Sequence, residues 1–437
     1  MIKKKSLLRT CVIAAAVLIV CCFAQATQAT TIYVGTCKTG PNVYATITLA
    51  LAHATPGTII DVCPGYYAEQ VTITLDNITL QGIPYTSSGI TEYAAVITPP
   101  SGGLVQNGTV IDSDEPGPAA AQILVQGVTG VTISHIIVDA QSNQSCAASG
   151  NIIGIYYENA SGTVTDSVAR NQNEGGGNGD QCGWGIAAES SGTQSLTVTN
   201  SSVHNFQKNG IVARGTNSAG LTLTATGNTV IGVGAVAGNA AQNGIEIAFG
   251  ATGSVKSNYV ANMLDATFGG QAAGILLYAT TGSPVVETNA VESTNTGIAI
   301  FYDSGFGGGG SDATISSNHI GGTNVFDGID LCGANETAKS NIIYSSTNSG
   351  IHLDDSCEAS VSGSNSTVTT NTINEACAGV LSGPTSTNNT ATPNTYFNTG
   401  YEQFGGTNTC TLPAGPLNNV KGKSEGQTAK KAVKPRP

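Results

Sequence analysis

The stretch Gly244-Ile245-Glu246-Ile247-Ala248, followed by Ser254-Val255-Lys256 and Asn258-Tyr259-Val260-Ala261, contains the pattern that decides the fold. A Gly followed by Ile or Val and a short apolar alternation recurs every 22–34 residues, and so does Asn-x-Val or Asn-x-Ile. Such a repeat with strand-like content is typical of a solenoid, in which each repeat stacks on its neighbours. The glycines are Gly154, Gly185, Gly210, Gly244, Gly274, Gly297, Gly328, Gly350 and Gly379, and the asparagines are Asn228, Asn258, Asn289, Asn318, Asn341 and Asn371.

Each repeat predicts three strands. The Gly-Ile strand comes first, a second strand follows, Asn stands at a tight turn, and a third short strand leads into a connection of variable length. Three strands per coil, all wound the same way, predict an all-β parallel β-helix. Stacked Asn side chains would hydrogen-bond one another and the buried backbone. We expect Asp166, Ser201 and His135 at this position in the earlier coils.

The N-terminal part of the solenoid needs a cover, because exposed strand edges and core recruit other chains. Apolar residues at helical spacing between Tyr44 and Ala54, ended by Pro56-Gly57, predict a short capping helix there. The stretch from Ser101 to Pro118 is expected to be a loop.

The first 29 residues indicate a signal peptide. A basic segment with Lys3 to Lys5, an apolar segment from Cys11 to Phe23 and small-residue cleavage sites follow one another. No other apolar run is long enough to span a bilayer. We therefore expect a secreted, periplasmic or cell-surface protein, with a lipoprotein anchor at Cys21 or Cys22 as the alternative. The β-helix domain is expected over 30–412, and a disordered basic tail over 413–437.

Eight cysteines remain after the leader, an even number that favours disulfides in an exported chain. Cys146 and Cys182 each precede one of two consecutive Gly-Ile strands, and Cys332 and Cys357 each follow one of two consecutive Gly-Ile strands. The other two pairs join nearby coils. Metal binding is the alternative, although no Cys-x-x-Cys spacing supports it. The predicted pairs are Cys37–Cys63, Cys146–Cys182, Cys332–Cys357 and Cys377–Cys410.

The charge is low and acidic. Only 10% of the residues are charged and the formal net charge is −12. Between Thr30 and Val420 there are six basic residues, so this body would repel nucleic acid and anionic membranes. It would bind an acidic polysaccharide only with help, for which Ca²⁺ is a candidate. The oligomeric state is left open.

The repeats and three N-terminal motifs resemble the right-handed parallel β-helix of the pectin-lyase-like superfamily. The motifs are Tyr44-Ala-Thr-Ile47, Pro56-Gly57 and Val62-Cys-Pro-Gly-Tyr-Tyr67-Ala-Glu-Gln-Val71. The resemblance covers roughly residues 31–412. It implies a carbohydrate-directed protein whose sugar chain lies on the outer face of the strand that follows the long connections. Here that strand is the Gly-Ile strand. Strand alternation points side chains two and four residues after each Gly outward.

One outward column contains Glu158, Glu189 and Arg214 in consecutive coils. Two carboxylates one strand spacing apart raise each other's proton affinity, and their separation suits the ~5–5.5 Å of retaining glycosidases. Arg214 would hold a substrate carboxylate or serve as the base of a lyase. We expect these three to be catalytic; a self-neutralising surface charge ladder is the alternative. The residues expected to bind sugar are Tyr156, Trp184, Tyr278 and Arg170.

A second outward group contains Asp330, His352 and Asp354, with Asp327 and Asp355 nearby. Histidine beside carboxylates on adjacent coils predicts an acid–base pair or a metal pocket; a solvated acidic rim is the alternative.

The Asp residues of the second group superficially resemble polygalacturonase but fail on register. The slot before the next Gly-Ile holds Asn348-Ser349, and Ala378 stands where the family's His should be. No pectin methylesterase or alginate epimerase signature is visible. Two functions stay open: a lyase or glycoside hydrolase acting on a polysaccharide, and a non-catalytic surface, adhesion or glycan-binding β-helix.

Overall fold

A computed structural model describes the chain between residues 29 and 410, with several gaps. The described residues are 29–87, 90–111, 117–142, 144–146, 150–174, 181–216, 220–235, 241–265, 272–303, 312–323, 325–356, 363–406 and 410. Contacts divide the chain into Met1–Thr30 and Thr31–Pro437, and the second unit contains the fold. The predicted signal peptide and basic tail fall almost entirely outside the described residues, so both stay predictions.

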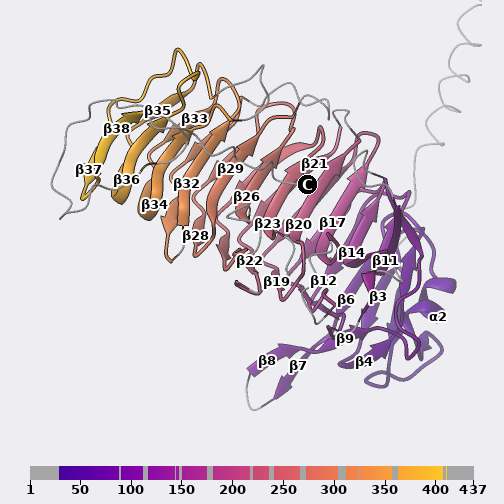
Figure 1. Ribbon diagram of the computed structural model, residues 1–437. Coiled ribbons are helices and arrows are strands. Elements are labelled where there is room, and N and C mark those ends of the chain that lie inside the picture. Colours follow the sequence, from indigo (N-terminus) through magenta and orange to yellow (C-terminus); the bar gives the residue numbers. More distant parts are fainter. Residues whose placement is uncertain are drawn as a thin grey trace, which may run out of the picture. The chain divides into compact units, whose positions relative to one another are not determined.

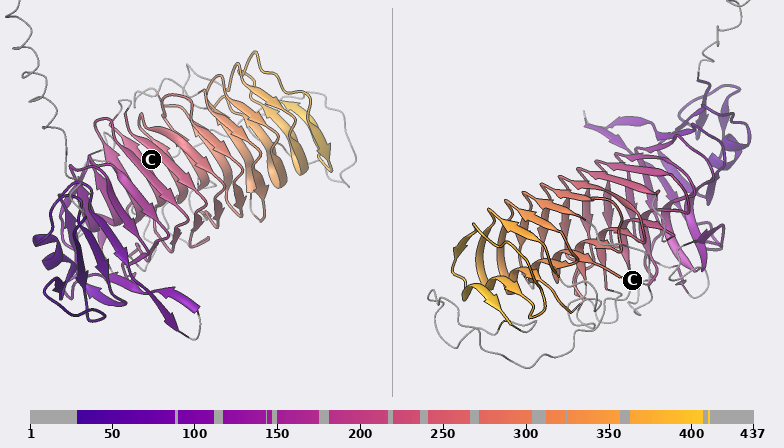
Figure 2. Two further views of the ribbon diagram at one scale, coloured as in Figure 1. Left: turned by 180° about the vertical axis from the view of Figure 1, so that it is seen from behind. Right: turned by 90° about the horizontal axis from the view of Figure 1, so that it is seen from above.

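The second unit is a parallel β-helix in which strands of successive coils lie side by side (Figures 1 and 2). Among the described residues, one sheet has 13 strands and contains the second strand of each coil. It consists of β1 (Thr31–Val34), β2 (Val43–Tyr44), β3 (Ile59–Val62), β6 (Thr79–Gly82), β12 (Val131–Ser134), β15 (Gly162–Thr165), β18 (Ser195–Thr199), β21 (Thr222–Thr226), β24 (Thr252–Lys256), β27 (Val285–Glu287), β30 (Thr314–Ser316), β33 (Thr337–Lys339) and β35 (Thr367–Thr369).

The other large sheet has 23 strands and contains both the Gly-Ile strands and the short third strands. The Gly-Ile strands and their equivalents are β5 (Val71–Ile73), β11 (Gly117–Gln126), β14 (Asn151–Glu158), β17 (Trp184–Ser190), β20 (Asn209–Gly215), β23 (Asn243–Ala248), β26 (Ala273–Tyr278), β29 (Thr296–Phe301), β32 (Val325–Cys332), β34 (Ile342–Leu353), β36 (Thr372–Ser382) and β38 (Tyr401–Gly405). The others are β4 (Gly65–Ala68), β9 (Ala95–Thr98), β10 (Gly108–Val110), β13 (Ile136–Asp139), β16 (Val168–Arg170), β19 (Ser202–His204), β22 (Thr229–Ile231), β25 (Tyr259–Ala261), β28 (Ala290–Glu292), β31 (His319–Gly321) and β37 (Thr395–Phe397).

The Gly-Ile motif reflects how closely successive coils approach. A Cβ atom on Gly274 would lie 2.7 Å from the carbonyl oxygen of Gly297 in the next coil and 2.4 Å from Val291 Cγ1. The isoleucine that follows each glycine points inward, and those from Ile155 to Ile351 are fully buried in one core. Each repeat therefore buries an aliphatic side chain on its neighbours, as predicted.

The Asn ladder is also present. Asn289 is a representative member: its Nδ2 donates to Val255 O and to Asn318 Oδ1, both at 2.9 Å. Its Oδ1 in turn accepts from the backbone N of Asn258 at 3.0 Å. The same pattern joins the neighbouring members as far as Asn394.

The predicted start of the ladder is partly wrong. Ser201 belongs to it, since its N donates to Asn228 Oδ1 at 2.9 Å. His135 and Asp166 have φ of 56° and 48°, like Ser257 at 55°, and so occupy the turn position one residue earlier. Ser167, not Asp166, is the ladder residue, because its Oγ accepts from Ile136 N at 3.3 Å.

The N-terminal end is covered by α2 (Ile47–Ala52), shorter than the predicted segment. Thr46 caps it by accepting from Leu49 N at 3.1 Å, and Ile47 and Ala50 are buried in the core. A hairpin of β7 (Pro84–Ser87) and β8 (Ile90–Tyr93) projects from the early coils (Figures 1 and 2).

Three of the four predicted disulfides are present: Cys37–Cys63, Cys146–Cys182 and Cys377–Cys410. Cys332 is also disulfide-bonded, while its predicted partner Cys357 lies outside the described residues. In the described ranges no helix is long and apolar enough to cross a membrane.

Candidate functional site

The first predicted cluster has the expected register. Glu158 pairs with Glu189, and Glu189 pairs with Arg214, on adjacent strands β14, β17 and β20. The alternation argument therefore predicted this column correctly.

The cluster is nevertheless covered, which the sequence did not predict. The expected loop from Ser101 to Pro118 contains β10, which pairs antiparallel with β11 and lies over the column. The backbone N–H of Thr109 donates to Glu158 Oε2 at 3.3 Å, and the backbone N–H of Ile111 donates to Glu189 Oε2 at 2.8 Å. Glu158 is 7% exposed and Glu189 0%. A solvated charge ladder is thus excluded, and both carboxylates anchor a covering strand.

The third member of the column is engaged as well. Arg214 Nε lies 3.1 Å from Glu246 Oε1, and its guanidinium lies 4.6 Å from the Trp184 ring centre. A second aromatic ring, that of Phe249, lies 5.4 Å from the same guanidinium. Since Arg214 is 4% exposed, this cation is part of a buried network.

The predicted sugar platforms are buried too. Tyr156 is 0% and Trp184 1% exposed, and both pack with Val110 of the covering strand. Tyr278 is buried and donates to Asp303 Oδ2 at 2.7 Å. Arg170 lies on β16 in a different column, where it forms an ion pair with Asp139 at 2.8 Å. These four residues do not form an open sugar-binding surface together.

Glu189→Ala is expected to lower the free energy of unfolding by about 1–3 kcal/mol, because Ile111 N loses its buried acceptor while the Tyr156 hydroxyl keeps only Thr109 O. Guanidinium unfolding measures the change, and Glu287→Ala, at a half-exposed surface ion pair, should change stability by less than about 0.5 kcal/mol. Equal stability of Glu189→Ala and the parent would contradict the anchoring role.

The second predicted cluster is brought together by β32 and β34. Asp330 and His352 are direct partners on adjacent strands. His352 Nδ1 lies 3.4 Å from Asp327 Oδ2 and 3.8 Å from Asp330 Oδ1, and Nε2 lies 3.9 Å from Asp354 Oδ1. The side chain of Asp330 is 22% exposed whereas that of His352 is 4% exposed. The cluster therefore has a buried base and one carboxylate that reaches the surface.

The electrostatics of this cluster are unusual. Burial by itself lowers the pKa of His352, but the hydrogen bond and charge of Asp327 and the charges of Asp330 and Asp354 outweigh it and raise the pKa to about 10. Burial raises the pKa of Asp330 well above its usual value, and the charges of Asp354 and Asp327 add to this against the opposing effect of His352. Perturbed groups of this kind concentrate at functional sites.

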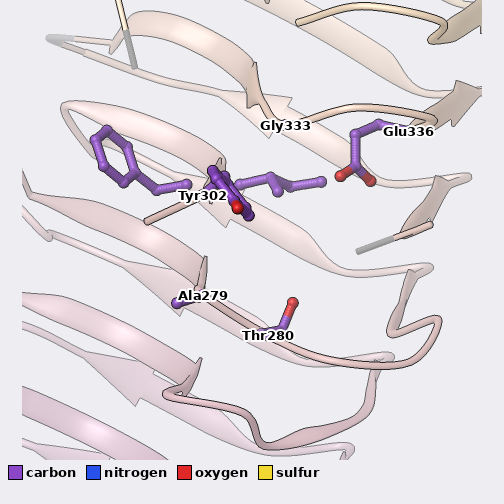
Figure 3. A pocket seen from close by; sticks show the side chains of 7 residues that line it. Ala279, Thr280, Tyr302, Gly333 and Glu336 are labelled. Atoms are coloured by element: carbon purple, nitrogen blue, oxygen red, sulfur yellow. The ribbon is translucent and has the colours of Figure 1, made fainter. Parts of the chain in front are cut away.

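A small, open pocket lies at the ends of β26, β29 and β32, with about 170 Å³ of space that includes open solvent (Figure 3). Phe301 lines it and is the strand partner of Cys332, whose Sγ lies 3.7 Å from Asp354 Oδ2. The ring of Phe301 stacks on Tyr278 at 5.5 Å. The lining residues are Ala279, Thr280, Ile300, Phe301, Tyr302, Gly333 and Glu336.

The half-buried Phe301 and Tyr302 were not among the predicted sugar-binding residues. For Phe301 the signal was available, since it continues the column of Tyr278. Tyr302 follows the strand end, where alternation makes no prediction.

Comparison with known proteins supports the fold. Residues 184–396 match the family described as "Right handed beta helix region". Among solved structures, the GH136 lacto-N-biosidase from Eubacterium ramulus is similar at 10% identity, with a TM-score of 0.51, over 85% of this chain and 67% of that chain. No curated protein sequence matches.

Two further structures have lower scores. The pectate lyase Pel9A is 13% identical over 92% of this chain and 79% of that chain, with a TM-score of 0.40. The pectin methylesterase PemA from Erwinia chrysanthemi is 12% identical over 68% and 91%, with a TM-score of 0.34. At these identities likeness concerns fold alone. The stacked coils, the sheet topology and the match over residues 184–396 show that the chain folds as a right-handed parallel β-helix.

Proposed function

We propose that this protein cleaves a polysaccharide by hydrolysis at the cluster of Asp327, Asp330, His352 and Asp354. The observation that carries the proposal is that Asp330 Oδ1 and His352 Nε2, both buried atoms, have no hydrogen-bond partner among the residues that the structure describes. Unsatisfied buried polar groups are costly, and a site that must meet a substrate explains why they persist.

Hydrolysis of a glycosidic bond uses two carboxyl groups flanking the bond. Asp330 and Asp354 lie toward opposite ring nitrogens of His352. In the proposed reaction Asp330 accepts a proton from the attacking water, and protonated Asp354 donates a proton to the leaving glycosidic oxygen as the C–O bond breaks. The half-buried Phe301, next to Cys332 on the adjacent strand, offers an apolar ring face for a sugar.

Elimination is the less favoured reaction, because the basic residues that would serve it are engaged. Arg170 forms an ion pair with Asp139, Arg214 forms one with Glu246, and Lys208 Nζ donates to Ala241 O at 2.8 Å. Glu158 and Glu189 are covered by β10 and are therefore less accessible to a polymeric substrate than Asp330, whose side chain is partly exposed.

Export forms part of the proposal. Three disulfides between described cysteines support an oxidising compartment such as the periplasm or the cell exterior. Detection of the protein lacking its first 29 residues in a culture medium or periplasmic fraction would test this, and an intact N-terminus in the cytoplasm would contradict it.

The function is tested with a panel of neutral and uronic polysaccharides. Hydrolysis predicts new reducing ends without the ultraviolet absorbance of unsaturated products, whereas elimination produces both. Retention on a glycan array without any turnover would contradict the enzymatic function and support a non-catalytic glycan-binding function.

Asp354→Asn is expected to reduce turnover by about 10²–10⁴-fold, the range for loss of a proton-transferring group. The neighbouring Asp355 contacts Thr385 through Oδ2 at 2.7 Å and is not part of the cluster. Asp355→Asn is therefore the matched control and should retain turnover. Equal rates for the two variants would exclude Asp354 from the reaction.

A further inference from the structure

We infer that Asp327 Oδ2, Asp330 Oδ1 and His352 Nδ1 form a binding site for one divalent first-row metal ion of the zinc or manganese type. This inference goes beyond the proposed function, because metal binding is measurable without any glycan. It rests on four features of the cluster.

The first feature is spacing. The two carboxylate oxygens lie 3.4 and 3.8 Å from His352 Nδ1, beyond the 2.7–3.2 Å of a good N–H···O hydrogen bond. All three atoms lie within 4.8 Å of one another. Ligands about 2.0–2.2 Å from a tetrahedral ion stand roughly 3.3–3.6 Å apart. The contact with Asp327 is thus a long hydrogen bond, and the three separations also match those between ligands of one shared cation.

The second feature is the orientation of Asp327. Its Oδ1 accepts from Asn348 Nδ2 at 2.8 Å, from Ser349 N at 3.0 Å and from the Ser349 hydroxyl. These donors fix the carboxylate so that Oδ2 faces His352. Metal-binding carboxylates are typically held by such outer hydrogen bonds.

The third feature is what surrounds the other ligands. Asp330 Oδ1 is buried and has no hydrogen-bond partner in the described part of the chain. His352 is 3% exposed, and its second ring nitrogen faces Asp354 Oδ1 at 3.9 Å. An imidazole that binds a metal through one nitrogen usually presents the other to a carboxylate, and Asp354 occupies that place.

The fourth feature is charge. Within the described residues, the ion pairs of Asp327 and Asp330 involve only His352. One buried and one partly exposed carboxylate thus face a single imidazole, and these oxygen and nitrogen donors together suit a divalent cation. The imidazole suits zinc and the two carboxylates also suit manganese, whereas Ca²⁺ takes six to eight oxygen ligands. Three protein ligands also leave a coordination position for water.

The test uses the full-length protein, stripped with a chelator and dialysed, in calorimetric titrations with ZnCl₂, MnCl₂ and CaCl₂. We expect one saturable site for Zn²⁺ or Mn²⁺, and binding at least about 100-fold weaker in His352→Gln. His319→Gln, at an exposed histidine on β31, should bind like the parent. Asp354→Asn should weaken binding by about 10–100-fold, as removal of an outer partner does.

Asp330→Asn is the second ligand variant, since its carboxylate oxygen Oδ1 has no hydrogen-bond partner whose loss would disturb folding. It should also bind at least about 100-fold more weakly, with an unchanged melting temperature of the metal-free protein. No one-site binding of either metal, or equal binding by the parent and His352→Gln, would overturn the inference. Equally tight Ca²⁺ binding that survives His352→Gln would also overturn it.

The outcomes also separate this inference from the proposed function. Metal binding without polysaccharide turnover would contradict the proposed function and leave the metal site standing. Full turnover by the chelator-treated protein, together with no metal binding, would contradict the metal site alone.

Discussion

Asn289→Ala is expected to lower the free energy of unfolding by about 3–5 kcal/mol. The side chain satisfies several buried groups at once: it donates to Val255 O and accepts from both the backbone N and Nδ2 of Asn258. Alanine leaves these groups without partners at 1% exposure of the site, and each buried unsatisfied group costs about 1–3 kcal/mol. The midpoint of guanidinium unfolding, followed by circular dichroism, measures the loss.

Asn394→Ala is the matched control at the end of the ladder. Asn394 also accepts from Asn371 N at 2.9 Å, but it is only half-buried, so water can replace part of what is lost. We expect less than half the effect of Asn289→Ala. Similar losses at the two positions would show that burial of the ladder does not determine its contribution.

Gly274→Ala is expected to destabilise the protein by about 3 kcal/mol, the upper part of the range for overpacking. The added Cβ would lie 2.7 Å from the carbonyl oxygen of Gly297 and 2.4 Å from Val291 Cγ1. Because the first of these atoms is backbone in the neighbouring coil, side-chain rotation does not relieve the clash. The strands β26 and β29 would have to separate, which weakens their pairing.

The control is Gly405→Ala on β38, where a Cβ meets nothing within 4 Å. Its stability should stay within about 0.5 kcal/mol of the parent. Thermal unfolding of both variants provides the measurement. A Gly274→Ala protein as stable as Gly405→Ala would refute the account of the Gly-Ile motif as a close approach between coils.

The repeat allowed the strand partners to be predicted, because residues at the same position in successive repeats of a parallel β-helix lie on adjacent strands. Glu158, Glu189 and Arg214 form one column, and Asp330 faces His352 on the next strand, as alternation predicts. The burial of the first column was not predictable in this way. It is caused by β10, an antiparallel excursion within a connection that has no counterpart in the repeat.

The strand alternation also did not predict side-chain directions at irregular positions. The pairing of β32 with β34 shifts register between Val325 and Asp327, and such irregularities change the direction of nearby side chains. Alternation therefore placed Asp327 only near the cluster, whereas its Oδ2 faces His352 directly. The one-residue error at His135 and Asp166 arose in turns, where the period of two does not apply.

The central claim is that the functional centre is the cluster around Asp330 and His352 and not the covered pair of glutamates. The most direct measurement compares release of reducing ends by Asp330→Asn and by Glu189→Gln on the polysaccharide that the parent cleaves best. We predict that Asp330→Asn loses at least about 100-fold in turnover while folded Glu189→Gln stays within about twofold of the parent. The opposite result, with Glu189→Gln inactive and Asp330→Asn active, would contradict the account.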